Sequence, residues 1–281
     1  FKGHSPIAMS LAELSARGRA HGNAHPTAYQ SAHATLSPEH PATLLYTSGT
    51  TGMPKGVMIS HDAWIYQAEA IEALDVMTPA DVQVLFLPLS HVFAKAMVAV
   101  FIRVGVPTLL DGDTQRLPSN LADLKPTWFA AVPLVLDEIR TKALEVVEQM
   151  SPLQRKMADR AFEVARKISD LELDHQRVPS HLRVQRAAID RTVMRPLRER
   201  LGGQLRFIVC GGAPLAEDTC RFFHALGIPV LEGYGLTESG GAACVNRPDH
   251  PRPGTVGPPL PGTEVHLAED GEVHIRNRGL F

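Results

Sequence analysis

A run of small hydroxyl-bearing and glycine residues that ends in a lysine is the segment best suited to chemistry. Residues 46–56 read Tyr-Thr-Ser-Gly-Thr-Thr-Gly-Met-Pro-Lys-Gly. Glycines let backbone N–H groups approach an anion, hydroxyls add donors, and Lys55 supplies a point charge for phosphate oxygens. A Walker loop needs Ser or Thr after the lysine, and Gly56 stands there instead. The run therefore predicts a phosphate-binding loop of another kind.

Two further motifs also follow short apolar runs. Residues 232–238 read Glu-Gly-Tyr-Gly-Leu-Thr-Glu, which predicts a turn with Tyr234 between two glycines and its ring exposed for stacking on a base. Thr237 offers a hydroxyl, and Glu238 offers the hard oxygen ligand that Mg²⁺ prefers. Residues 211–215, Gly-Gly-Ala-Pro-Leu, form a third site where a ligand can approach the backbone closely. Because open α/β sheets bind ligands beyond the carboxyl ends of their strands, we expect the three motifs to meet there.

The elements that must position these motifs alternate between strands and helices. Short apolar runs predict strands at 42–46, 128–132, 207–209 and 230–231, and buried strands at 82–87 and 106–110. Helical spacing predicts helices at 61–74 and 95–104. This alternation indicates an α/β fold with mostly parallel sheets flanked by helices. Residues 263–275 alternate around Asp270-Gly271 and predict a hairpin, which is a short C-terminal β segment.

The first 40 residues differ in composition from the rest, with the change at Pro41. Ser10 and Glu13 have the spacing of a capping box and predict a helix over 10–17, with the remainder as loop. The histidines of this region are not spaced as metal ligands, so we expect them on the surface: His4, His21, His25, His33 and His40.

Residues 134–201 are long, helical and charged. Fourteen basic and nine acidic residues over 140–200 leave a local charge of +5. The simpler interpretation is a solvated helical insert. The alternative is a face that meets an anionic membrane or an anionic substrate, as a peripheral contact.

Composition excludes several classes of protein. The chain has 281 residues, a net charge of −2 and a hydrophobic share of 44%, which is ordinary globular composition without global attraction to nucleic acid. No apolar run is long enough for a membrane span. Cys210, Cys220 and Cys244 form no CxxC pair, which favours a reducing, cytoplasmic location, and Cys210 is expected in the core. The start on Phe-Lys lacks the pattern of a signal peptide, and we expect a piece cut at both ends.

The motifs at 46–56 and 233–238 together resemble those of the adenylate-forming (AMP-binding) superfamily, which includes acyl-CoA synthetases, luciferases and the adenylation domains of peptide synthetases. The resemblance extends from about Pro41 to the C-terminus, and residues 271–275 are similar to a weaker family signature. Residues 87–93, Leu-Pro-Leu-Ser-His-Val-Phe, resemble the motif at the acyl pocket. The helical insert resembles the long-chain fatty acyl-CoA synthetase branch.

The resemblance implies a role for each matching residue. It assigns the β- and γ-phosphates of ATP to Thr47, Ser48, Gly49, Thr50, Thr51, Gly52 and Lys55. It places Gly212, Ala213 and Pro214 along the adenine and the acyl carboxylate, and Tyr234, between Gly233 and Gly235, on the adenine ring. Thr237 would bind the α-phosphate, Glu238 would hold Mg²⁺, and His91 would lie where the carboxylate meets ATP. The implied catalytic set is Lys55, His91, Thr237 and Glu238.

The activity implied by the resemblance is that of an ATP-dependent long-chain fatty acid–CoA ligase. ATP, a fatty acid and coenzyme A would be its substrates, Mg²⁺ its cofactor, and acyl-AMP its intermediate. Two alternatives stay open: an adenylating ligase for aryl or amino acids, and a non-catalytic nucleotide-binding remnant.

The family pattern also implies a domain organisation. Residues 1–253 would be the central part of the adenylation domain, and residues 254–281 the start of a β subdomain. Family members carry a ribose-binding aspartate and a small C-terminal domain with a catalytic lysine beyond the position of Phe281. The chain by itself is therefore expected to be inactive.

Overall fold

The computed structural model describes residues 9–47 and 53–281. The chain divides into two compact units, Phe1–His40 and Pro41–Phe281, and this boundary coincides with the change in composition at Pro41. The smaller unit holds helices α1 (Leu11–Ala24) and α2 (Ala28–Ala34), and neither helix buries a residue. The predicted capping box is confirmed, since Ser10 Oγ accepts from Glu13 N and the Glu13 carboxylate accepts from Ser10 N. Helix α2 corrects the expected loop, because its alanine-rich sequence has high helix propensity.

The larger unit is built on a six-stranded sheet with the strand order β4-β3-β5-β6-β7-β8. Its strands are β3 (Gln83–Leu85), β4 (Thr108–Leu110), β5 (Trp128–Ala131), β6 (Phe207–Cys210), β7 (Val230–Leu236) and β8 (Gly241–Val245). All neighbours pair in parallel except β8, which runs antiparallel to β7. The expected α/β fold with a mostly parallel sheet is therefore confirmed.

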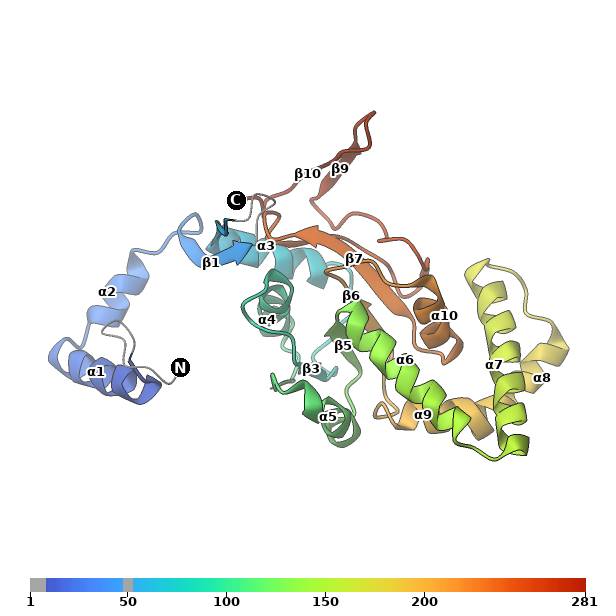
Figure 1. Cartoon of the computed structure of the whole chain (residues 1–281). Coiled ribbons are helices and arrows are strands. Elements are labelled where there is room, and N and C mark those ends of the chain that lie inside the picture. The colour runs from blue at the N-terminus through green and yellow to red at the C-terminus, as the bar shows by residue number, and fades with distance from the viewer. Residues whose placement is uncertain (1–8, 48–52) are drawn as a thin grey trace. The chain divides into compact units, whose positions relative to one another are not determined.

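Helices cover both faces of this sheet. Figure 1 shows α4 (Val92–Val104) on one side of β5–β7 and α6 (Pro133–Glu148) with α10 (Glu217–Ala225) on the other. Helix α3 (His61–Glu72) packs beside α4, and α5 (Leu117–Leu124) follows the short 3-10 turn Thr114–Arg116. All four side chains of β5 are fully buried. The continuous apolar runs seen in the sequence arise from this burial on two faces.

The structure corrects two predictions about individual strands. Strand β4 was expected to be buried but lies at the edge of the sheet, with the side chain of Leu110 55% exposed. Strand β7 is longer than predicted, because it continues past the sheet core to pair with β8. Strand β8 has the sequence Gly-Ala-Ala-Cys-Val, in which small residues hide the strand pattern.

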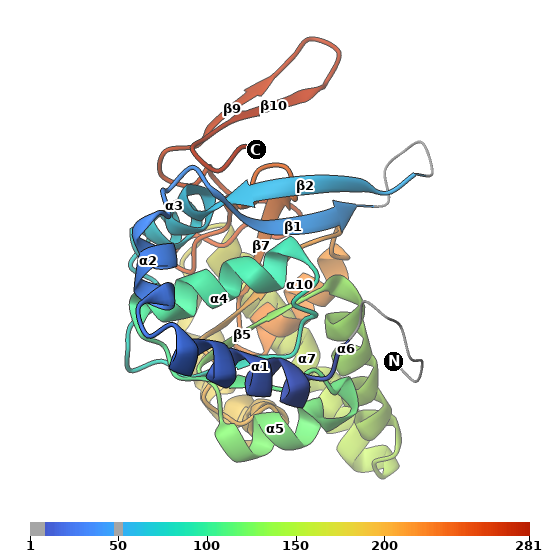
Figure 2. The ribbon, with the colours of Figure 1, turned by 90° about the vertical axis from the view of Figure 1, so that its left-hand side faces the viewer.

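Two antiparallel ribbons flank the main sheet. Strands β1 (Pro41–Thr47) and β2 (Lys55–Ser60) form one, and β9 (Glu264–Leu267) and β10 (Val273–Arg276) form the predicted C-terminal hairpin (Figure 2). Val57 and Ile59 of β2 are buried against α3, while the side chains between them face outward. Arg278, just after β10, makes two hydrogen bonds of 2.7 Å to the Asp62 carboxylate and one of 3.0 Å to Glu69 on α3.

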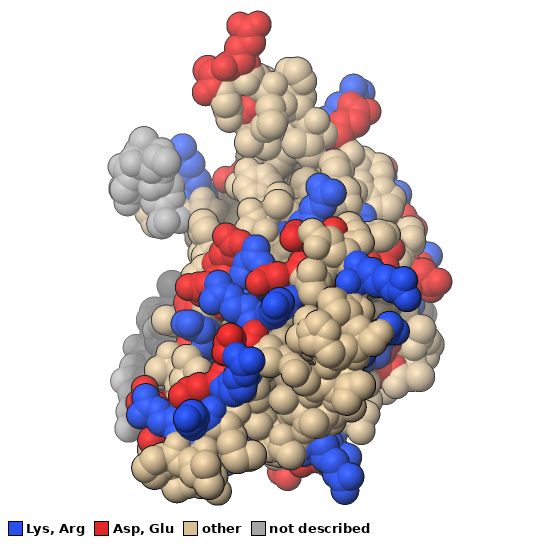
Figure 3. All heavy atoms as spheres, turned by 90° about the vertical axis from the view of Figure 1, so that its right-hand side faces the viewer, with Lys and Arg blue, Asp and Glu red and all other residues tan. Residues whose placement is uncertain are grey.

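The crossover between β5 and β6 is helical, as predicted for residues 134–201. After α6 it contains α7 (Pro152–Leu173), α8 (Ser180–Ile189), a π-helical turn (Asp190–Met194) and α9 (Arg195–Glu199). Many of its basic residues have acidic partners, including Arg160 with Glu163 and Arg198 with Asp190. Figure 3 views the molecule from the side of α7 and α8 and shows acidic and basic side chains next to one another. This local charge pairing favours the solvated interpretation of the insert.

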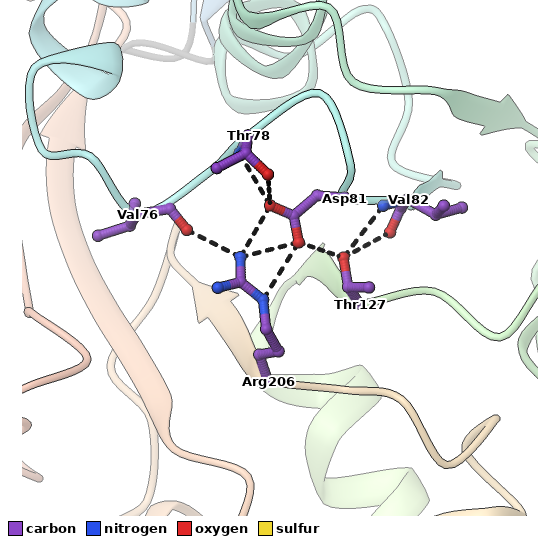
Figure 4. A network of polar contacts seen from close by, with 6 residues as sticks. All are labelled: Val76, Thr78, Asp81, Val82, Thr127 and Arg206. Carbon is purple, nitrogen blue, oxygen red and sulfur yellow. Dashed lines mark hydrogen bonds and ion pairs between the residues drawn. The ribbon is translucent and has the colours of Figure 1, made fainter.

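A polar network ties together the amino ends of three strands (Figure 4). Asp81, which is 4% exposed, accepts hydrogen bonds from Thr127 Oγ1 at 2.6 Å, from Thr78 N at 2.8 Å and from the Arg206 guanidinium. Thr127 and Arg206 immediately precede β5 and β6, and Asp81 lies two residues before β3. The network lies at the amino ends of these strands, whereas residues 211–215 follow the carboxyl end of β6, so we assign the network to stability.

Candidate functional site

A cavity of about 110 Å³ lies between helices α3 and α4 and strands β6 and β7, and it extends to Val76 after α3 and to Phe207 at the start of β6. Phe93 and Met97 of α4 line one wall, and Val209 and Leu231 line the other. Among the residues that the structure describes, no Asp, Glu, Lys or Arg lines this cavity, which we call the edge cavity. It suits an apolar molecule with a polar group at one end.

The segment after β6 forms part of the cavity wall. Gly211 is buried, and a Cβ placed on it would lie 3.4 Å from the Gly233 carbonyl oxygen and 3.7 Å from the Phe93 ring. Gly212 has a φ of +88°, which favours glycine, and it also lines the cavity. Ala213 and Pro214 follow on the exposed loop toward α10 and do not line it.

Gly233, Tyr234 and Gly235 of β7 line the same cavity. The sequence predicted a turn at Tyr234, and this is wrong, because Tyr234 lies in β7 opposite Cys244 of β8. The glycine at 235 is needed for that pairing, since a Cβ there would lie 1.9 Å from the Gly241 carbonyl oxygen. The ladder shifts register between Tyr234 and Gly235. Glycines at this motif therefore allow close strand approach instead of a turn.

Gln67 on α3 is a site residue that sequence reasoning missed. Its side chain is fully buried, and its amide donates to the Ala242 carbonyl oxygen at 2.9 Å and accepts from Ala242 N at 3.1 Å. The amide thereby takes the place of a neighbouring strand at the free edge of β8. Because Gly241 and Ala242 line the edge cavity, Gln67 fixes one of its walls.

Thr237 and Glu238 lie in the connection between β7 and β8, where Gly240 N donates to the Thr237 carbonyl oxygen. Both side chains are half-buried, and neither lines the cavity. The Glu238 carboxylate makes no hydrogen bond or ion pair with the described residues, so it is free to bind a ligand. In the described part of the chain, no group of three or more His, Cys, Asp or Glu could hold a metal ion. One free carboxylate fits Mg²⁺ that takes its other ligands from nucleotide phosphates and water.

Thr47 and Lys55 are opposite each other at the end of the β1–β2 ribbon where the chain passes from one strand to the other. Lys55 is exposed and has no ion-pair partner among the described residues. The predicted loop residues Ser48, Gly49, Thr50, Thr51 and Gly52 lie outside the described residues. The buried side of the ribbon packs against Val92, which also lines the edge cavity. The ribbon and the cavity are therefore in contact through the start of α4.

His91 occupies the N-cap position of α4, directly before the cavity residues Val92 and Phe93. Its exposed ring makes no capping hydrogen bond. His91 does not itself line the edge cavity, but its backbone adjoins two residues that do. The described histidines of the N-terminal unit (His21, His25, His33 and His40) are exposed, as expected, whereas His4 lies outside the described residues.

The buried thiols in and behind the wall of the edge cavity are poor nucleophiles. Burial raises the pKa of both Cys210 and Cys220 to about 12, so these thiols stay protonated, and Cys210 is in the core as predicted. Burial also raises the pKa of Glu232, whose carboxylate accepts from Gly254 N at 2.8 Å. Buried Asn246 accepts from Arg252 N at 3.1 Å, so Glu232 and Asn246 together hold the loop after β8.

The edge cavity thus brings together four of the predicted site residues, Gly212, Gly233, Tyr234 and Gly235, on an α/β sheet of the type that binds nucleotides. The sequence profile of the AMP-binding enzyme family matches residues 5–280, and the chain belongs to that family.

Relatives and solved structures agree with this assignment. The chain is 34% identical over 253 residues to the long-chain-fatty-acid–CoA ligase FadD15 of Mycobacterium bovis, covering 88% of this chain and 41% of the relative. It is 35% identical over 265 residues to long chain acyl-CoA synthetase 4 of Arabidopsis thaliana, covering 85% and 38%. The o-succinylbenzoate coenzyme A synthetase of Bacillus subtilis, solved with ATP and a magnesium ion, has the same fold at 19% identity, with a TM-score of 0.59 and coverage of 87% and 43%.

The chain spans less than half the length of these curated relatives. None of the helices that the structure describes combines the length and apolar character needed to cross a lipid bilayer.

Proposed function

We propose that the chain is the central part of the adenylation domain of an ATP-dependent long-chain fatty acid–CoA ligase. The observation that carries this proposal is the edge cavity, whose described lining is mostly apolar and carries no charged side chain, and which includes Tyr234 and its flanking glycines. An uncharged lining suits an acyl chain, whereas an amino acid would require an acidic partner for its ammonium group. The names of the curated relatives support the same substrate class.

In this proposal, each motif contacts a different part of ATP. Tyr234 stacks on the adenine, beside Gly212, Ala213 and Pro214. Thr47, Lys55 and the loop between them, with Ser48, Gly49, Thr50, Thr51 and Gly52, hold the β- and γ-phosphates. An unpaired lysine at the end of a ribbon suits this task, because its charge is not neutralised by a protein carboxylate.

The reaction then needs positioning and charge stabilisation more than a protein nucleophile. A carboxylate oxygen of the fatty acid attacks the α-phosphorus, the bond to the bridging oxygen breaks, and pyrophosphate leaves. Thr237 donates to the α-phosphate, and His91 lies where the acyl carboxylate enters at the rim. Mg²⁺ held by Glu238 would neutralise phosphate charge. The thiol of coenzyme A then attacks the acyl carbon, which releases AMP and gives the thioester.

A ligase for aryl acids is a second candidate. It is favoured by the solved structure of the o-succinylbenzoate coenzyme A synthetase, whose fold the chain shares. A third hypothesis is that the chain is a non-catalytic nucleotide-binding remnant. Such a protein would bind ATP and form no adenylate.

The deciding experiment is ATP–pyrophosphate exchange by the full-length protein with Mg²⁺ and a panel of acids. We expect exchange with palmitate at least tenfold above that with benzoate, o-succinylbenzoate or amino acids. Ala242→Phe, which places a ring in the edge cavity, should move the preference toward shorter acids, whereas Ala188→Phe on exposed α8 should not. Preference for an aryl or amino acid would overturn the substrate class, and no exchange with any acid would overturn the activity.

A further inference from the structure

Helix α6 lies on the face of the sheet opposite α4 (Figure 1). Two apolar hollows lie along α6. One, of about 200 Å³, lies between α5 and α6. The other, of about 180 Å³, lies at the corner between α6 and α7. Both are lined by Val146, Leu197 and Arg200, so the two hollows adjoin at these residues. We call the pair the α6 groove.

The walls of the α6 groove are largely apolar. Leu117, Leu121 and Ile139 line the first hollow, and Met150 and Met157 line the second. Met157 is 55% exposed although it is a large apolar side chain. Each hollow has room for many waters but offers them few polar partners, and such cavities are poorly hydrated. An apolar ligand segment would therefore gain free energy by entering.

Among the described residues at the rim of the groove, one cation has no ion-pair partner. Lys142 Nζ lies 2.6 Å from Glu138 Oε1, so these two charges compensate each other. Arg200 is exposed and makes no ion pair with any residue in the described ranges 9–47 and 53–281. Its neighbours on α9 differ, since Arg195 pairs with Glu199 and Arg198 pairs with Asp190. A ligand that fits the groove thus has an apolar body and one anionic group.

The α6 groove is separate from the edge cavity. The two share no lining residue, and α4 and α6 lie on opposite sides of the sheet. A ligand in the groove would not contact Tyr234 or the glycine motifs. Binding there would therefore be an additional property of the molecule, independent of adenylate formation.

We propose that the α6 groove is a second acyl-binding site, which takes a molecule with an unbranched acyl chain and a carboxylate head. The acyl chain lies against the apolar walls along α6, and the carboxylate pairs with the Arg200 guanidinium. Arg200, unpaired within the described part of the chain and placed where the two apolar hollows adjoin, matches a single headgroup. If a protein bound this surface and no acyl chain did, a free fatty acid would not reduce the binding of that protein.

The test is photolabelling of the purified protein with a diazirine-bearing palmitate analogue, followed by peptide mapping. We expect labelled peptides from α6 and α9, in addition to any from the edge cavity. Arg200→Glu should lower labelling of the α6 and α9 peptides at least tenfold and leave edge-cavity labelling unchanged. Arg195→Gln on the same helix, a residue that does not line the groove, is the matched control and should change neither.

A diazirine-bearing hexadecanol gives an independent readout, because it keeps the chain and lacks the charge. It should label the α6 and α9 peptides at least fivefold less than the acid in the unaltered protein. Equal labelling by acid and alcohol, or labelling unaffected by Arg200→Glu, would overturn the assignment of the carboxylate to Arg200. Absence of label from α6 and α9 in the unaltered protein would overturn the site itself.

Discussion

Lys55 illustrates how a single side chain depends on its element. It is placed by the pairing of β2 with β1 opposite Thr47, and its ammonium group has no partner within the described part of the chain. If a lysine served only to keep the surface soluble, its replacement would not change the use of ATP. A lysine that binds phosphate would affect ATP use more than use of the acid.

We therefore predict that Lys55→Ala in the full-length protein raises the KM for ATP about ten- to hundredfold. The loss of one charge-assisted hydrogen bond to a phosphate costs roughly 1.5–3 kcal/mol, which corresponds to this range. Pyrophosphate exchange measured against ATP concentration at saturating acid would show the change. Lys156→Ala, on exposed α7, should leave the KM for ATP unchanged. A KM within twofold of the unaltered value for Lys55→Ala would contradict the assignment.

At the scale of single residues, the sequence predicted only part of the site. The glycine motifs and Tyr234 were identifiable because their residue types are unusual in sequence, and the structure gathers Gly212, Gly233, Tyr234 and Gly235 around one cavity. Gln67 gave no such signal, because a glutamine in a helix normally faces water. Only the packing of α3 against the free edge of β8 makes its amide a strand partner.

At the scale of elements, the Asp81 network offers a test of what aligns the strands. We predict that Asp81→Asn lowers the free energy of unfolding by about 1.5–3 kcal/mol at neutral pH, since hydrogen bonds to a buried carboxylate are lost or weakened. Urea unfolding followed by circular dichroism would measure the difference. Asp75→Asn, at an exposed position, is the control and should change stability little.

The effect of Asp81→Asn should also depend on pH. Burial by itself raises the pKa of Asp81, but hydrogen bonds from Thr127 and Thr78 and the Arg206 charge outweigh it and hold that pKa below its ordinary value of 3.8. A carboxyl with a lowered pKa stabilises the fold above its unfolded pKa, and this contribution is lost as the pH falls through the folded pKa. The difference between the two proteins should therefore shrink below about pH 3.8. A difference that grew with acid would contradict this argument.

The elements themselves were predicted to different degrees. The buried parallel strands β3, β5 and β6 were found from their apolar runs, since burial on both faces leaves few polar residues. Strand β2 was missed although Val57 and Ile59 alternate with exposed residues, because it adjoins the glycine-rich loop. Strand β8 lacks residues with high strand propensity, and it is specified by its partner β7 and by Gln67.

At the scale of the whole molecule, the two units should differ greatly in stability. Helices α1 and α2 bury no residue, and isolated helices of this length are marginal in water. We predict that hydrogen exchange is fast throughout α1 and slow in β5, whose side chains are fully buried. Exchange followed by mass spectrometry would measure both segments in one experiment. Equal protection of α1 and β5 would contradict the prediction.

The contacts of α3 have a consequence for synthesis on the ribosome. Asp62 on this helix binds Arg278, which follows 216 positions later, and Gln67 binds Ala242, which follows 175 positions later. At about 5–20 residues per second, α3 leaves the ribosome roughly 10–40 s before Arg278 is made. During that interval α3 can pack on β2 and α4, but the Gln67 amide and the Asp62 carboxylate lack these native partners. The nascent chain would therefore depend on chaperones at this helix, and its yield in cells would respond to translation speed downstream of residue 72.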